Sequence, residues 1–165
     1  MDIGSQNEYP SCALSNFAAH EFYLDGVRCA SMEGFLQSLK CKNPEMQKHI
    51  CSLIGIAAKR AGRERNDWKK RQKLYWQGKS YDRRSVFYQQ LLDRAYDALG
   101  ENPGFRKALK AAGNAVFTHS VGKRKEGETV LTVQEFCSRL NRLRSKIFGT
   151  EPEREKSEKM KKFLI

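Results

Sequence analysis

The hydrophobic residues of the chain recur at helical spacing in several separate stretches, and residues that begin or end helices bound most of them. Four stretches follow a residue whose side chain can accept hydrogen bonds from the first backbone N–H groups of a helix: Ser31, Asn43, Asn102 and Thr132. Glycine follows the last turn of several stretches, at Gly55, Gly100, Gly113 and Gly149. The pattern predicts helices over residues 31–40, 43–55, 84–99, 102–113 and 132–148, with a further turn over 56–61.

One short stretch has the pattern of a β-hairpin. Residues 21–24 and 27–30 both contain hydrophobic residues, and Asp25-Gly26 between them is a typical two-residue turn. The remaining segments have weaker patterns. We expect an irregular lead-in over 1–12, a loop or short helix over 63–80, a strand or extended segment over 115–117 and a loop over 118–129.

These elements together predict the fold class. Helices outnumber strands, and nothing in their order indicates a doubly wound sheet, so we expect a compact, mostly helical single α+β domain with a short N-terminal β-hairpin. With 165 residues the chain is long enough to bury a sizeable core. The domain is expected over residues 13–149. Residues 150–165 are rich in charged side chains and are expected to form a tail, either helical or disordered.

The expected helix over residues 31–40 has two chemically different faces. Its hydrophobic residues, which suit a core, are Met32, Phe35, Leu36 and Leu39. At about 100° per residue, Glu33, Gln37 and Lys40 fall instead on a separate arc of about 60°. This strip presents a carboxylate, an amide and an amine together, so we interpret it as a candidate active site. Glu33 has a simpler interpretation as well, because a carboxylate in the first turn stabilises the helix dipole.

The net charge of +12 is concentrated in one segment of the chain. Residues 59–84 contain eleven Lys and Arg residues against three acidic residues, which gives this segment a charge of +8. Such a segment can attract phosphates or nucleic acid, or it can be a solvated surface. Three aromatic residues within it could stack on a nucleobase or fill the core: Trp68, Tyr75 and Trp76.

Several classes of site find no support in the sequence. The five cysteines and three histidines are scattered and form no CxxC pair, so no zinc site is indicated, and we expect free thiols in the cytoplasm. The chain has no P-loop, GxGxxG or GxSxG motif and no cluster of carboxylates for two metals, so no cofactor or metal is expected. No hydrophobic run is long enough for a membrane helix.

The loop over residues 118–123 is a second candidate site. Its sequence, Thr-His-Ser-Val-Gly-Lys, combines hydroxyls, an imidazole, a glycine and a lysine. Backbone N–H groups and a lysine in such a loop can bind phosphate. His119, Gly122 and Lys123 are therefore expected to contact a substrate.

Short motifs in the first 40 residues resemble the signature of the NADAR family, the YbiA-like N-glycosidases. They are Leu14-Ser15-Asn16-Phe17, Leu24-Asp25-Gly26, Ser31-x-Glu33, and Phe35 with Gln37 through Lys40. The NPxxRxAL-like segment over 102–109 and the final helix with Arg142 and Arg144 continue the likeness, which covers about residues 14–148. The resemblance implies a largely helical α+β fold and hydrolysis of N-glycosidic bonds. Members of this family act on ribosylamino intermediates of riboflavin synthesis and on ADP-ribose attached to guanine bases.

The resemblance also implies roles for residues. Glu33 would be the catalytic carboxylate, in a pocket that Asn16, Gln37 and Lys40 also line, and Ser15 and Phe17 belong to the same motif. We further hypothesise that Lys40 forms an imine with the sugar carbon. The family's RxDW element matches Arg65-x-Asp67-Trp68 only with altered spacing, so Trp76 and Arg83 are expected to take over its role. The family's Asp…Trp-Gly element is missing, and the loop over 118–123 stands in its place.

Two functions follow from these observations. The first is an N-glycosidase that acts on an ADP-ribosyl or ribosylamino-pyrimidine substrate, as a free nucleotide or on ADP-ribosylated nucleic acid. The second is a non-catalytic module that binds ADP-ribose, a related nucleotide or nucleic acid. We expect no membrane partner, and a monomer or a small homo-oligomer.

Overall fold

The computed structural model describes residues 1–149, in which helices outnumber strands. In chain order the elements are α1 (Ser11–Leu14), β1 (Phe22–Leu24), β2 (Val27–Cys29), α2 (Met32–Ser38), α3 (Pro44–Cys51), α4 (Gly55–Arg63), α5 (Trp68–Arg71), β3 (Lys73–Trp76), β4 (Lys79–Asp82), α6 (Val86–Leu99), α7 (Pro103–Ala111), the 3₁₀ turn η1 (Glu126–Glu128) and α8 (Val133–Phe148). The mostly helical α+β class predicted from the sequence is confirmed. The tail expected over 150–165 lies outside the described residues.

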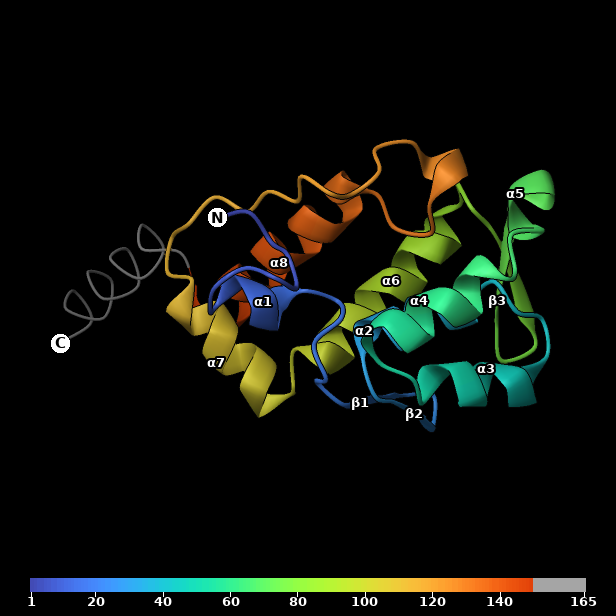
Figure 1. The fold of residues 1–165 in the computed structure, drawn as a ribbon, viewed down its shortest axis with the longest axis horizontal. Helices are drawn as coiled ribbons and strands as arrows, with labels where there is room; N and C mark the ends of the chain where they lie inside the picture. Colours follow the sequence, from blue (N-terminus) through green and yellow to red (C-terminus); the bar gives the residue numbers. More distant parts are fainter. Residues whose placement is uncertain (150–165) are drawn as a thin grey trace, which may run out of the picture.

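Helix α6 runs through the middle of the molecule and packs against β1, β4 and α8 (Figure 1). Its buried side chains cover one broad face and are Tyr88, Leu91, Leu92, Ala95, Tyr96 and Leu99. Phe87, in the first turn of the same helix, lies outside this face and is 65% exposed. Phe35 of α2, Phe105 of α7 and Leu140 of α8 are buried in the same core, so one core connects distant parts of the chain.

The predicted helix starts are confirmed by their caps. Side chains that accept backbone N–H hydrogen bonds are those of Ser31, Asn43, Ser85, Asn102 and Thr132. The predicted helix over 43–55 is wrong at its end, because α3 stops at Cys51 and α4 begins at Gly55 as a separate helix. Gly55 has φ of 54°, a left-handed conformation that glycine adopts readily and that redirects the chain.

The structure contains two hairpins where the sequence predicted one. β1 and β2 pair around Asp25-Gly26 as predicted, with both turn residues at positive φ. β3 and β4 pair around Gln77-Gly78, which also have positive φ values of 45° and 86°. The loop or short helix expected over 63–80 is therefore corrected to the short helix α5 and this second hairpin.

The first ten residues form no helix or regular strand, but they are attached to the domain. Ile3 is fully buried, and Asp2 forms an isolated parallel bridge with Thr118. Figure 1 shows the N-terminus beside the loop that leads toward α8. The strand or extended segment expected over 115–117 forms no strand and leads into this bridge, with Phe117 buried and Val116 77% exposed.

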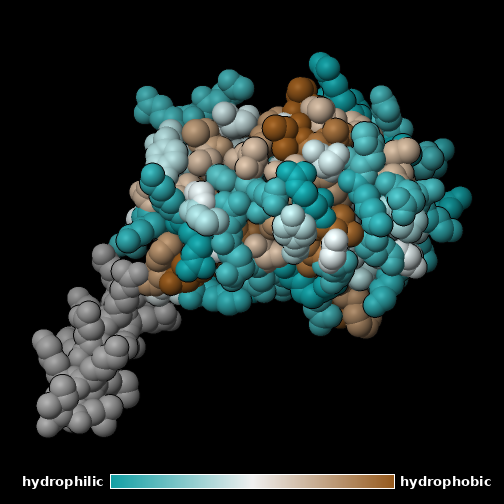
Figure 2. Space-filling view, turned by 90° about the horizontal axis from the view of Figure 1, so that it is seen from below, coloured by the Kyte–Doolittle hydropathy of each residue, from teal (hydrophilic) through white to brown (hydrophobic). Residues whose placement is uncertain are grey.

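One face of the described part of the molecule is mainly polar (Figure 2). Figure 2 shows hydrophobic residues on this face in small separate groups. Within residues 1–149, none of the helices is both long and hydrophobic enough to cross a bilayer. The same residues include no group of three His, Cys, Asp or Glu side chains placed to bind a metal ion. All five cysteines are free thiols.

Candidate active site

Helix α2 brings the predicted carboxylate and amide together. The hydroxyl of Ser31 caps the helix by accepting a hydrogen bond from Gly34 N at 3.1 Å. One turn apart on the helix, Gln37 Nε2 donates to Glu33 Oε1 at 2.8 Å. Lys40 follows the helix end, where its N–H donates to Gln37 O at 3.3 Å. Three adjacent polar side chains therefore come from one short segment.

Two close backbone approaches fix the position of α2. A Cβ on Gly34 would lie 2.7 Å from Leu53 O, so only glycine allows the chain after α3 to pass this close. A Cβ on Gly62 of α4 would overlap the side chain of Gln37. α4 therefore presses Gln37 against Glu33, and Gln37 Oε1 is buried without a hydrogen-bond partner among the described residues.

The segment after α1 lies over the start of α2. Glu33 N donates to Asn16 O at 2.9 Å, which attaches this segment to the first turn of the helix. The side-chain oxygen of Asn16 accepts from Tyr96 OH at 2.8 Å. Ser15 Oγ accepts from Phe17 N at 3.2 Å and so shapes the turn. Three residues of the predicted pocket therefore come from this segment.

Burial raises the pKa of the Glu33 carboxyl above its ordinary value. The hydrogen bond from Gln37 and the charges of Lys59, Lys40 and His119 act in the opposite direction without cancelling the effect of burial. A raised pKa favours a protonated carboxyl that can give up its proton nearer neutral pH. The site therefore contains a candidate general acid.

The pKa of Lys40 is shifted in the opposite direction, below its ordinary value. Burial is the main cause that lowers its pKa to about 8, and the charges of Lys69 and Lys123 lower it further, while Glu33 raises it. A lysine with a pKa of about 8 is partly neutral at physiological pH and can act as a nucleophile. The gathering of several cations around one carboxyl also suits an anionic ligand.

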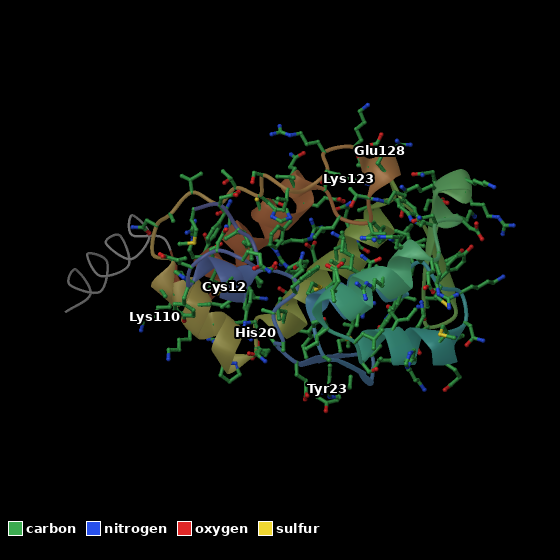
Figure 3. All side chains as sticks on the ribbon, viewed as in Figure 1. Cys12, His20, Tyr23, Lys110, Lys123 and Glu128 are labelled. Carbon is green, nitrogen blue, oxygen red and sulfur yellow. The ribbon has the colours of Figure 1, made fainter. Side chains whose placement is uncertain are left out.

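The loop between α7 and α8 supplies further predicted residues. His119 Nδ1 lies 2.7 Å from Ile3 O, and its ring packs edge-on against Phe136 with centroids 5.1 Å apart. A Cβ on Gly122 would lie 2.5 Å from His119 Cδ2, so this glycine lets the loop close on the imidazole. Lys123 is exposed on the same loop (Figure 3).

Two predicted substrate-binding residues have structural roles instead. Trp76 is 1% exposed, its Nε1 donates to Asp25 Oδ2 at 2.8 Å, and its ring packs against Phe35 at 5.0 Å. Arg83 is fully buried and forms a two-pronged ion pair with Glu135, at 2.6 and 3.1 Å. The expectation that they contact substrate is corrected, because the protein itself occupies their polar groups. Trp68, at 3% exposed, also fills the core.

Two further residues, Lys59 and Tyr96, contribute to the site although no sequence motif marks them. Lys59 acts on the pKa of Glu33, and its Nζ lies 6.0 Å from the centre of the Phe17 ring. It was visible only as one charge of a basic run. Tyr96 orients Asn16, but in the sequence it belonged to the hydrophobic stripe of α6. The signal that could have identified Tyr96 is a tyrosine within a buried hydrophobic stripe, because a buried tyrosine hydroxyl needs a hydrogen-bond partner.

Comparison with known proteins places this arrangement in a family. The profile described as bacteriophage protein GP30.3 matches residues 8–145. An uncharacterised 17.1 kDa protein from the Gp30–rIII intergenic region of Enterobacteria phage T4 is 42% identical over 150 residues, which are 89% of this chain and 98% of the T4 protein. The NMR structure of the Escherichia coli protein YbiA matches 87% of this chain and 81% of its own, with a TM-score of 0.55 at 18% identity.

The matches agree with the motifs found in the sequence. The profile covers the segment after α1, the whole of α2 and the loop that carries His119. The YbiA structure, at its low identity, supports the fold. The chain therefore belongs to the bacteriophage protein GP30.3 family, a NADAR-type family with the YbiA-like fold.

Proposed function

We propose that this protein is an N-glycosidase that hydrolyses a C1′–N bond of an ADP-ribosyl or ribosylamino-pyrimidine substrate. The observation that carries the proposal is the mostly buried carboxyl of Glu33, with a raised pKa and a hydrogen bond from Gln37. It stands at the position where the NADAR-like motif has its catalytic carboxylate. The family's glycosidase activity supports the choice of reaction.

Glu33 alone can perform both halves of the hydrolysis. As the C1′–N bond breaks, its electron pair goes to the nitrogen of the base, which takes the proton of the Glu33 carboxylic acid. The resulting carboxylate faces the positive charge that develops on the sugar and stabilises it. Water then forms a bond to C1′, and the proton that it loses restores the carboxylic acid.

Lys40 offers a covalent route through the same site. Its neutral amine attacks C1′ as the base leaves with its electron pair. Of the two protons that the amine loses, one goes to the base and the other to the ring oxygen as the sugar opens to an imine. Water hydrolyses the imine and releases the sugar. Borohydride would reduce such an imine to a stable secondary amine, so intact-mass analysis after reduction decides between the two routes.

The proposed substrates carry phosphate, which agrees with the charges around the site. Lys40, Lys69 and Lys123 come from three separate parts of the chain, and all three influence the same region. None of them forms an ion pair with an acidic side chain among the described residues. Unpaired cations beside a sugar-binding carboxyl favour a ribose that bears phosphate or pyrophosphate.

The test is base release from defined substrates. The protein is incubated with ADP-ribosylated guanosine, with the same modification in an oligonucleotide, and with a ribosylaminopyrimidine phosphate, and free base is measured by chromatography. We expect Glu33→Gln to lower kcat by at least about 10²-fold. The matched control is Glu45→Gln, since Glu45 is an exposed first-turn acid of α3 that is also placed at a helix start. Equal rates for wild type and Glu33→Gln would overturn the assignment.

A non-catalytic binding module is the second candidate, and the basic segment over 59–84 favours it. Several of its cations are exposed on α4 and α5, including Arg60, Arg63, Lys69 and Lys70. Calorimetry with ADP-ribose and a salt series with unmodified DNA separate the possibilities. A steep loss of DNA affinity with salt, with no ADP-ribose binding and no base release, would favour plain nucleic-acid binding.

A further inference from the structure

The first residues of the chain run beside the loop that carries His119. Ile3 N donates to Thr118 O at 2.8 Å, and Thr118 N donates back to Met1 O at 3.0 Å. Ile3 is fully buried, so this pairing is anchored in the core. Segments more than a hundred residues apart in sequence therefore form one local structure.

The carboxylate of Asp2 binds the residues on both sides of His119. It accepts hydrogen bonds from Ser120 N at 2.8 Å, from Ser120 Oγ at 2.6 Å and from Thr118 Oγ1 at 3.0 Å. These hydrogen bonds, led by that from the Ser120 hydroxyl, lower the pKa of the Asp2 carboxyl. Asp2 itself is exposed, so it contributes no packing to the core. Its carboxylate contacts are concentrated on the two loop residues that flank one imidazole.

The contact with Ile3 determines which nitrogen of His119 carries the proton. A backbone carbonyl can only accept a hydrogen bond, so His119 Nδ1, at 2.7 Å from Ile3 O, must be the donor. In the neutral ring the free electron pair is then on Nε2. Packing on Phe136 and the close approach of Gly122 hold the ring plane as well. The imidazole is therefore fixed in both orientation and tautomer.

A series of packing and hydrogen-bond contacts links His119 to the segment that lies over the start of α2. Phe136, on which it packs, lies 6.4 Å from the ring of Tyr96, and the Tyr96 hydroxyl binds Asn16. Asn16 is in turn bound through its carbonyl to the backbone of Glu33. This series of contacts connects the imidazole to the backbone of Glu33 and uses neither Nε2 of His119 nor the Glu33 carboxyl.

We propose that His119 is a second acid–base group of the site and that Asp2 is its positioning residue. The inference rests on the proposed function. As water forms its bond to C1′, Nε2 of neutral His119 takes the water proton and then returns it to the Glu33 carboxylate, so both groups regain their starting protonation states. Asp2 touches no substrate and acts by holding the loop, so that Nδ1 stays on Ile3 and Nε2 remains free.

The first experiment needs no substrate. Nitrogen chemical shifts of the His119 ring are measured by NMR in the full-length protein, for wild type, Asp2→Ala and Asp2→Asn. We expect wild type to show one Nδ1-protonated tautomer, and Asp2→Ala to show a mixture. Asp2→Asn should resemble wild type, because its amide oxygen still accepts and its NH2 can donate to Ser120 Oγ. An unchanged tautomer in Asp2→Ala would overturn the positioning role, whether or not the protein releases a base.

The second experiment uses the proposed reaction. We expect His119→Ala to lower kcat by about 10²-fold, and Asp2→Ala to lower it by about 10-fold with little change in KM. In the His119→Ala background, Asp2→Ala should have no further effect, because it acts only through the imidazole. Independent effects of the two substitutions would overturn the proposal. Glu8→Ala, an exposed acid of the same segment, is the control and should behave as wild type.

Together the two experiments distinguish a failure of the proposed N-glycosidase function from a failure of the roles proposed for His119 and Asp2. If wild type releases no base from any substrate, the proposed function fails, and the NMR result still decides whether Asp2 positions His119. If base release depends on Glu33 but not on His119, the proposed function stands and His119 is not an acid–base group. Thermal unfolding of each variant shows whether the loop substitutions leave the fold intact.

Discussion

At the scale of single residues, the pKa of Glu33 distinguishes its two interpretations, a carboxylate that stabilises the helix start and a carboxylate of an active site. A carboxylate that stabilises a helix start is favoured in its charged form, so its pKa would fall. Burial instead raises the pKa of Glu33, although Gln37 donates a hydrogen bond to it and Lys59 lies nearby. The charged form is therefore unfavourable in the folded protein. Such a residue costs stability, which argues for a functional reason to keep it.

A pH series on Glu33→Gln tests this argument. Because the folded-state pKa of Glu33 is raised above the ordinary value of 4.5, the contribution of this residue to stability is fully present below about pH 4.5 and is lost as pH rises through the folded pKa. Glutamine has no such loss. We expect the free energy of unfolding of Glu33→Gln to exceed that of wild type at neutral pH, and this gain to shrink toward pH 4.

Urea unfolding of both proteins at a series of pH values measures this difference. Glu45→Gln, an exposed acid in the first turn of α3, is the control and should show no gain at neutral pH. A Glu33→Gln variant that is less stable than wild type at pH 7 would return Glu33 to the role of a helix-start stabiliser.

Residue types alone predicted some side-chain contacts of the candidate site and missed others. Helical spacing was enough to bring Glu33 and Gln37 together, because both lie on one helix. Trp76 and Arg83 were expected in the pocket, but their partners are Asp25, 51 positions away, and Glu135, 52 positions away. A local pattern cannot show which distant side chain will occupy a polar group. The buried roles of these two residues could be learned only from the folded structure.

At the scale of elements, the site depends on how closely α4 approaches α2. Gly62 of α4 faces the side chain of Gln37, and this approach leaves no space for a Cβ. The sequence showed only a glycine near the end of a short stretch, which is a common helix stop. In the structure Gly62 lies inside α4, so its small size serves packing against α2.

Gly62→Ala should therefore reverse the usual effect of such a substitution. Alanine in place of glycine normally stabilises a helix by up to about 1 kcal/mol. Here the new methyl group would displace Gln37 from Glu33, and we expect a loss of stability of about 1–3 kcal/mol together with lower activity. Chemical unfolding and base release measure the two effects. Ala57→Ser, on the exposed side of α4, should change neither by much.

The second hairpin shows why one element was missed. β3 alternates in burial, with Leu74 and Trp76 inside, but basic residues surround it and obscured the pattern. Its turn, Gln77-Gly78, has the left-handed conformations of a two-residue hairpin, yet glutamine at the first position is an uncommon residue for them. The first hairpin was found because Asp25-Gly26 is a much stronger turn signal.

At the scale of the whole molecule, a buried polar network attaches α8 to the rest of the domain. Arg83, between β4 and α6, binds both carboxylate oxygens of Glu135 in the first turn of α8. Gln89 of α6 also donates to Glu135, at 2.6 Å. Glu135 further forms the capping box of α8 with Thr132. The sequence predicted Thr132 as the cap of this helix, but it did not show that the carboxylate of Glu135 would also neutralise a buried arginine.

Acid should weaken this network in a way that one substitution can reveal. Burial opposes the charged form of Glu135, but the hydrogen bonds from Arg83, Gln89 and Thr132 N outweigh it, and the pKa of Glu135 is lowered. A lowered pKa means that the contribution to stability is present above about pH 4.5 and is lost as pH falls through the folded pKa. Glu135→Gln leaves Arg83 buried without its counter-charge, so we expect a loss of about 3–5 kcal/mol at pH 7.

Because wild type also loses the carboxylate charge in acid, the gap between the two proteins should narrow as pH falls below about 4.5. Urea unfolding at neutral and acidic pH measures the gap, with Glu101→Gln as an exposed control that should remain close to wild type. A gap that stays constant with pH would mean that the shape of the Glu135 side chain, and not its charge, attaches α8. Since α8 also carries Phe136, against which His119 packs, loss of this attachment should disturb the candidate site from a distance.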